Sequence, residues 1–177
     1  EYDFFSKKEN RRDRDIVCFI EKKEEYRGRE SYVYEAPSRG MVYFVVYEDG
    51  KFIVRGAKVR LPIFSFIHLD IELDPPLCVL KGPLKTGAVW EYEGTAKVRF
   101  LAIGRIDSFI GVKFEVKEES IFSINGENVS VYRVHAVMNR SWGDENPITS
   151  DIWLGRGIGT VKAETKNSLM EIKGLGE

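Results

Sequence analysis

The sequence contains no glutamine, only two cysteines and two histidines, and no surplus of charge of either sign. A net charge of −1 excludes an overall basic field that would attract nucleic acid or an anionic membrane surface. The longest apolar run, Met41 to Tyr47, is much shorter than the ~20 residues of a membrane-spanning helix, so we expect no transmembrane segment. Balanced charges without glutamine are typical of heat-adapted proteins and favour a thermophilic source.

The two cysteines, Cys18 and Cys78, form neither a C-x-x-C motif nor a metal-ligand spacing. Two buried thiols are the first interpretation. A disulfide between them is the second, and it would require an oxidising compartment. No local motif supports a catalytic thiol.

Apolar and polar residues alternate with a period of two over most of the chain, which predicts half-buried β-strands. Asp49-Gly50 and Asn125-Gly126 each lie between two such runs, and both pairs are typical of type I′ hairpin turns. A further hairpin is expected around Lys166-Asn167. No long stretch has a helical period, so the sequence predicts a mainly antiparallel β protein.

We expect residues 1–14 to form an N-terminal arm or short helix, because an aromatic cluster is followed by a charged run. Residues 15–177 are predicted to form a single β domain, with a possible sub-boundary near 74–83. Asp74-Pro75-Pro76 is expected to end a strand there. One continuous sheet is preferred over two domains, because each half alone would leave long strand edges unpaired.

Two segments place glycines beside a tryptophan: Gly82 to Tyr92, and Trp153 to Lys162. In the first, Trp90 is expected to begin a strand and to plug one end of the sheet. In the second, Gly155, Gly157 and Gly159 would leave a strip without side chains on one strand face, and we expect Trp90 or Trp153 to cover it. The G-x-G-x-G spacing is not a nucleotide loop, since a β pattern follows it where a helix would be needed.

The run Pro-Leu-Lys-x-Gly-x-x-Trp-x-Tyr, followed about sixty residues later by Trp-x-x-x-Gly-x-Gly-x-Val-Lys, resembles a pattern in uncharacterised bacterial envelope proteins and lipoproteins. The resemblance covers roughly residues 74–165. It implies a fold similar to that of the LolA/LolB lipoprotein carriers: a single strongly curved antiparallel sheet, or open half-barrel, with at most one or two short helices. It also implies a periplasmic or cell-envelope location, with the cytoplasm as the alternative, and a lipid-type ligand on the concave face.

Candidate chemistry is sparse. His68, Asp70 and Glu72 share one strand face and could bind a metal, but the two-residue spacing separates them too widely, so a solvated face is preferred. His135 is expected at the surface or in a hydrogen bond. The carboxylates of Asp144, Glu145 and Asp151 could serve a hydrolase, or could simply belong to an acidic surface loop. We therefore predict no catalytic residue, no metal and no cofactor.

Aromatic residues make up 12% of the chain and are the remaining indication of function. They would line a concave apolar groove for a lipid or peptide, or form an ordinary core. The predicted groove residues are Phe64, Phe66, Trp90, Tyr92, Phe100, Phe114, Phe122, Tyr132 and Trp153. The preferred function is a non-enzymatic extracytoplasmic protein that binds an apolar ligand. The alternatives are a structural or protein-interaction module with a fully packed core and, third, a hydrolase using the loop carboxylates.

Overall fold

The computed structural model describes residues 2–6, 11–16, 19–36, 40–60, 68–100, 104–141, 146–156 and 158–172, and within these ranges it contains strands and turns but no helix. The strands are β1 (Tyr2–Ser6), β2 (Arg11–Ile16), β3 (Phe19–Tyr26), β4 (Arg29–Ala36), β5 (Met41–Glu48), β6 (Lys51–Arg60), β7 (His68–Lys81), β8 (Val89–Phe100), β9 (Gly104–Ile124), β10 (Glu127–Arg140), β11 (Ile148–Gly155), β12 (Gly159–Thr165) and β13 (Ser168–Ile172). They form one curved antiparallel sheet that stays open, which confirms the predicted fold class.

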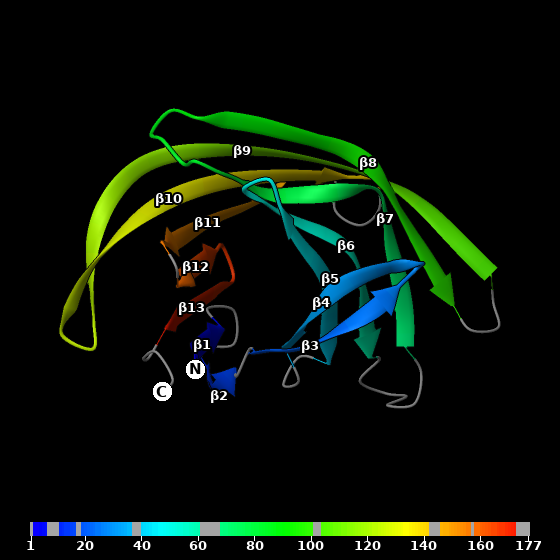
Figure 1. The fold of residues 1–177 in the computed structure, drawn as a ribbon, viewed down its shortest axis with the longest axis horizontal. Helices are drawn as coiled ribbons and strands as arrows, with labels where there is room; N and C mark the ends of the chain where they lie inside the picture. The colour runs from blue at the N-terminus through cyan, green and yellow to red at the C-terminus, as the bar shows by residue number, and fades with distance from the viewer. Residues whose placement is uncertain are drawn as a thin grey trace.

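The sheet is an antiparallel meander in which each strand from β3 to β13 pairs with the next one along the chain. Only β1 and β2 depart from this pattern, because they follow β13 at the far edge. The full order is β2-β1-β13-β12-β11-β10-β9-β8-β7-β6-β5-β4-β3. β1 pairs with β13, so the two ends of the chain meet in the sheet (Figure 1). β2 and β3 occupy opposite edges, although Phe19 follows Ile16 by three residues. Since an extended residue spans at most ~3.6 Å, the two edges approach within about 11 Å at this point.

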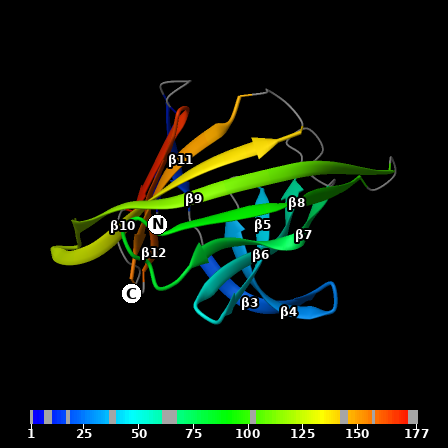
Figure 2. The ribbon, with the colours of Figure 1, turned by 90° about the horizontal axis from the view of Figure 1, so that it is seen from above.

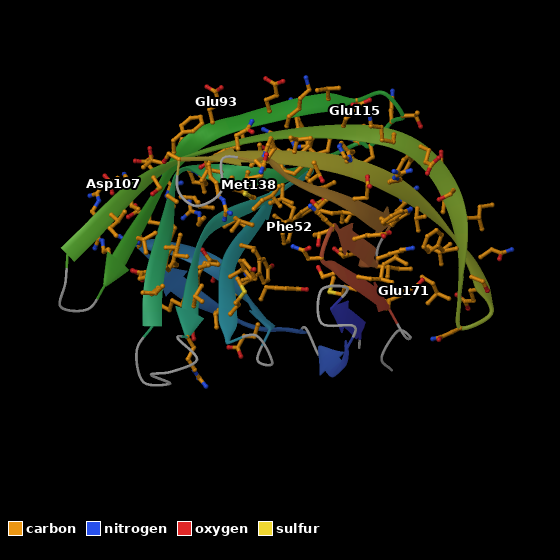
Figure 3. All side chains as sticks on the ribbon, turned by 180° about the vertical axis from the view of Figure 1, so that it is seen from behind. Phe52, Glu93, Asp107, Glu115, Met138 and Glu171 are labelled. Atoms are coloured by element: carbon orange, nitrogen blue, oxygen red, sulfur yellow. The ribbon has the colours of Figure 1, made fainter. Side chains whose placement is uncertain are left out.

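The curvature gives the sheet a concave and a convex face, and β8 and β9 cross the top of the arch (Figure 2). Glu93 and Glu115 lie on the convex face and point outward from the sheet (Figure 3). Because strand residues alternate between faces, their neighbours in β8 and β9 point into the hollow. The main core lies there, and its buried members are Trp90, Tyr92, Ala96, Ile110, Val112, Phe114, Val116, Val134 and Ala136.

β7 and β8 separate partway along their length, and two aromatic side chains bridge the gap. In the described residues, the two strands pair only over Asp70 to Asp74 of β7. Beyond that point the Trp90 Nε1–H donates to the Cys78 carbonyl (3.2 Å), and the Tyr92 hydroxyl donates to the Pro75 carbonyl (2.7 Å). The two side chains thus donate hydrogen bonds to β7 carbonyls that are not paired with β8. These hydrogen bonds stabilise the split, the place where β7 and β8 separate.

The prediction that Asp74-Pro75-Pro76 ends a strand is wrong, since β7 runs through it to Lys81. β7 leaves β6 between Glu72, which pairs with Gly56, and Leu77, which pairs with Val54. The prolines lie in this irregular stretch, where a residue without an N–H costs no ladder hydrogen bond.

The split makes stability sensitive to alkaline pH through Tyr92. Burial, with a smaller contribution from the Asp74 carboxylate, raises the pKa of Tyr92 to about 12. In the unfolded chain the Tyr92 phenol ionises near pH 10. The contribution of the neutral side chain to the free energy of unfolding, roughly 2.7 kcal/mol, is therefore complete below pH 10 and is lost by about pH 12. We expect the stability advantage of the wild type over Tyr92→Phe to shrink by that amount.

Urea unfolding of both proteins at pH 8, 10, 11 and 12 measures this change. Comparing the two proteins cancels the titration of the other tyrosines. An advantage that stays constant from pH 8 to pH 12 would contradict the assignment to Tyr92.

The tip of the β3–β4 hairpin folds over the convex face. Tyr26 stacks on Phe44 with 4.0 Å between ring centroids, and its hydroxyl lies 3.1 Å from Asp70 Oδ1. Arg27 bridges Asp70 and Glu72, with both N···O distances 2.8 Å. The two carboxylates that alternate with the core residues of β7 therefore hold the hairpin in place.

Residues 1–14 were expected to form an arm or short helix, but the described residues among them, 2–6 and 11–14, lie in β1 and β2. The reason is a long-range pairing: β13 offers an unpaired edge, and β1 satisfies its backbone groups over Tyr2 to Ser6. A local charge pattern carries no information about that edge. The proposed sub-boundary near 74–83 falls within the sheet, which continues on both sides of it through β6, β7 and β8. The described residues contain no helix of the length and apolarity that a membrane span needs.

Candidate apolar binding site

A cavity of about 360 Å³ lies inside the curved sheet, where strands from both halves of the chain face one another. Its walls are almost entirely apolar. The lining residues are Tyr34, Tyr43, Val45, Phe52, Val54, Val79, Leu80, Phe114, Val134, Ile152, Leu154, Ile158, Gly159 and Thr160. The volume falls in the range of ~300–1,000 Å³ that is typical of small-molecule sites.

Strand alternation places these side chains in the hollow. In β5, Tyr43 and Val45 line the cavity, while Phe44 between them points to the convex face and packs under Tyr26. In β11, Ile152 and Leu154 line the cavity in the same way. β5, β6 and β11 thus contribute alternate residues to the cavity, whereas β7 contributes the neighbours Val79 and Leu80 where its register with β6 shifts.

Phe114 connects the cavity to the core. Its ring stacks on Trp90 with 5.1 Å between centroids, and the side chain is only 4% exposed. Val134 beside it is 1% exposed. This part of the wall is therefore a rigid floor, held by the residues that bridge β7 and β8.

A second cleft, of about 610 Å³, adjoins the cavity and shares Leu80, Leu154 and Gly159 with it. It lies at the end of the sheet where the β5–β6, β7–β8 and β11–β12 connections meet. The residues that line only the cleft are Tyr47, Pro83, Leu84, Tyr132, Gly155 and Arg156. The cleft is more polar than the cavity, because Arg156 is among its lining residues.

The cleft carries titratable groups. Partial desolvation, and then the nearby Glu119 carboxylate, raise the pKa of Tyr132, while the positive charge of Arg156 acts in the opposite direction. The Ser130 hydroxyl donates to Glu119. Tyr132 therefore lies between a cation and a carboxylate, and it remains a neutral hydrogen-bonding group at neutral pH.

The structure distributes the predicted groove residues over several places. Phe114 lines the cavity and Tyr132 the cleft. Trp90 and Tyr92 lie in the core that supports the cavity. Phe64, Phe66 and the side chain of Phe100 lie outside the described part of the chain.

Phe122 and Trp153 belong to a separate cluster around Ile124, Val131 and Val161. Trp153 lies between two cations there, 5.6 Å from the Arg133 guanidinium carbon and 4.8 Å from Lys162 Nζ, measured to the ring centroid. These two aromatics do not line the cavity.

Sequence reasoning missed most of the lining residues, among them Tyr34, Tyr43, Phe52, Ile152 and Leu154. The alternation within β5 and β6 predicted which residues share a face. It did not predict that this face lies opposite β11 and β12. β11 itself was not predicted, because its sequence is polar at both ends of a short apolar stretch.

The glycine strip is a hairpin. Gly155 ends β11 and pairs with Gly159, which begins β12, while Gly157 lies outside the described residues. A side chain at Gly155 would meet aliphatic groups and no indole, namely those of Val161, Ile158 and Val129. The expectation that Trp90 or Trp153 covers the strip is therefore wrong, because Gly155 and Gly159 pair across two different strands and do not share one strand face.

Aromatic rings do cover glycines elsewhere in the sheet. A Cβ at Gly94 would lie 2.3 Å from the Tyr92 hydroxyl, and one at Gly56 would lie 2.4 Å from the Tyr26 hydroxyl. Both glycines are in strand interiors, where the absence of a side chain lets a ring lie flat on the backbone. An aromatic ring therefore covers a glycine at Gly94 and at Gly56, and not at Gly155 or Gly159, for which we expected it.

The alternative chemistries find no support in the described part of the chain. No group of three metal-binding side chains occurs there. Asp70 and Glu72 are occupied by Arg27, and the side chain of His68 is not described. Cys78 is a free thiol, and Cys18, its partner in the second of our two interpretations, lies outside the described residues.

Of the three loop carboxylates, Asp151 is the one that lies within the described residues. Asp144 and Glu145 are outside the described residues, and Asp151 lies in β11 with its Oδ1 3.0 Å from His135 Nδ1 and 3.2 Å from Arg133 Nε. His135 is thus in a hydrogen bond, as one of our two interpretations expected. Burial acts to raise the pKa of Asp151, but the hydrogen bonds from Arg133 and His135 outweigh it and lower that pKa.

Comparison with known proteins adds no constraint on this site. No protein-family model, no curated protein and no solved structure matches the chain.

Proposed function

We propose that this protein is a non-enzymatic binding protein that holds an acyl chain, or a similarly elongated apolar ligand, inside its curved sheet. The apolar cavity of about 360 Å³ between β4–β7 and β9–β12 is the observation that carries the proposal. A core that served only to stabilise the fold would close such a space, because an unfilled cavity loses packing energy.

The continuity of the two spaces also supports an elongated ligand. The cavity and the second cleft share Leu80, Leu154 and Gly159, so one molecule can extend from the cavity into the cleft. An acyl chain buries apolar surface along its whole length and requires few directional contacts. The resemblance to LolA/LolB carriers points the same way, and we extend the proposal to a role in the cell envelope.

Blocking the cavity tests the proposal. Ile152 lines the cavity in the middle of β11, and Thr149 is exposed on the other face of the same strand. We expect Ile152→Trp to weaken binding of a fluorescent sixteen-carbon acyl probe by about tenfold or more, because the indole occupies the volume of the chain. Thr149→Trp is the matched control and should bind the probe as the wild type does.

Native mass spectrometry before and after extraction with organic solvent gives an independent measurement. The wild-type protein should carry co-purified lipid, and Ile152→Trp should not. Ile152→Phe serves as a milder variant if the tryptophan impairs folding, which circular dichroism would reveal. A wild-type protein that binds no probe and carries no lipid would favour the structural or interaction module instead.

A further inference from the structure

The cleft that adjoins the cavity differs chemically from the cavity itself. The cavity has only tyrosine and threonine hydroxyls among its polar side chains, whereas the cleft adds a guanidinium, that of Arg156. The two spaces share three residues and so can be occupied by one molecule. A ligand that fills both would have an apolar tail and a polar head.

Arg156 lies in the turn between β11 and β12, where it is exposed and lines the cleft. It makes no ion pair with any residue that the structure describes, whereas Arg27, Arg105 and Arg133 do. Its charge acts on the Tyr132 hydroxyl in the same cleft. Guanidinium and hydroxyl donors close together are suited to a carboxylate or phosphate group.

Arg156 is the charged residue that lines the cleft. Lys51 begins β6 and Lys81 ends β7 at the same end of the sheet, directly opposite one another in the ladder. Their neighbours Phe52 and Leu80 line the cavity, so strand alternation places the two lysines on the other face of the sheet.

We infer that the ligand is an anionic amphiphile whose tail occupies the apolar cavity and whose carboxylate or phosphate head binds Arg156 in the cleft. The inference rests on the proposed function and specifies its ligand class. A negative head group in the cleft gives the Arg156 guanidinium the ion-pair partner that the described residues do not supply.

Four amphiphiles with the same sixteen-carbon tail test the inference: hexadecanoate, hexadecyl phosphate, hexadecanol and hexadecylamine. We expect the wild type to bind the two anions about tenfold more tightly than the alcohol, and the amine most weakly, because a charge-assisted hydrogen bond is stronger than a neutral one. Competition against the fluorescent acyl probe below the micelle concentration measures all four. The ratio between hexadecanoate and hexadecyl phosphate tells which head group fits.

Arg156→Gln should reduce the preference for anions to within about twofold and leave hexadecanol binding unchanged, since the tail site is intact. Lys166→Gln, in the β12–β13 turn at the other end of the sheet, removes the same charge and should keep the wild-type preference. Equal affinity of the wild type for the anions and the alcohol would overturn this inference and leave the proposed function standing. Failure of every amphiphile to bind would overturn both.

Discussion

Trp90→Ala is expected to lower the free energy of unfolding by about 3–5 kcal/mol, the range found for large aromatic truncations in cores. The indole is 8% exposed and stacks on Phe114. It also donates to the Cys78 carbonyl across the split between β7 and β8. Alanine would leave a cavity and a carbonyl without its donor, and each of these costs stability.

Trp153→Ala is the matched comparison, because it removes the same side chain from a different position. Trp153 is partly exposed and is held by cation–π contacts with Arg133 and Lys162, so we expect a loss of about 1–2 kcal/mol. Urea unfolding followed by far-UV circular dichroism measures both variants. Equal losses for the two tryptophans would show that Trp90 does not bridge the split as described.

Gly56→Ala is expected to cost about 3 kcal/mol or more, at the upper end of overpacking effects. The new Cβ would lie 2.4 Å from the Ile71 carbonyl oxygen and 2.4 Å from the Tyr26 hydroxyl. The side chain of Tyr26 can move, but the Ile71 carbonyl belongs to the backbone of β7. Displacement of Tyr26 would also separate it from Phe44 and Asp70.

Gly111→Ala is the control, since this glycine is also in a strand interior. Its Cβ would lie 3.3 Å from the ring of Phe109 and 3.9 Å, an ordinary contact distance, from the Tyr92 carbonyl oxygen, and Phe109 is 47% exposed and can shift. We expect a change of less than about 1 kcal/mol, measured in the same unfolding experiment. A comparable loss in both variants would mean that glycine is required by backbone conformation rather than by the aromatic ring.

These two predictions locate the stability of the sheet at its irregular points. A single curved sheet has no second layer to pack against, so its interior must be filled from its own strands. Trp90 and Tyr92 fill the place where β7 and β8 separate, and Tyr26 covers the place where β6 and β7 lose register. The apolar cavity remains where no such side chain reaches.

Local features of the fold were predictable. Asp49-Gly50 and Asn125-Gly126 form the expected hairpins with positive φ at both positions, because few other residue pairs adopt that conformation. The Thr165–Ser168 hydroxyl contact closes the third hairpin at Lys166-Asn167. The alternation in β8 and β9 identified the buried residues of the main core, including Trp90, Tyr92 and Phe114.

The candidate site was only partly predictable. Phe114 and Tyr132 were identified as aromatics on a concave face, but Tyr43, Phe52 and Ile152 were not. Their strands are separated by a large part of the chain, and the distance between them depends on how strongly the sheet curves. Arg156 carried no motif, and only its place in the cleft distinguishes it from other surface arginines.

The sequence by itself determined the class of fold, because turn residues and a two-residue period are local properties that each strand carries alone. Only the tertiary structure decided which strands form the edges, that β1 completes the sheet beside β13, and that β5 and β11 face each other across a cavity. Those outcomes depend on contacts between distant segments and on the accumulated twist of the sheet, and neither is encoded in the neighbourhood of a single residue.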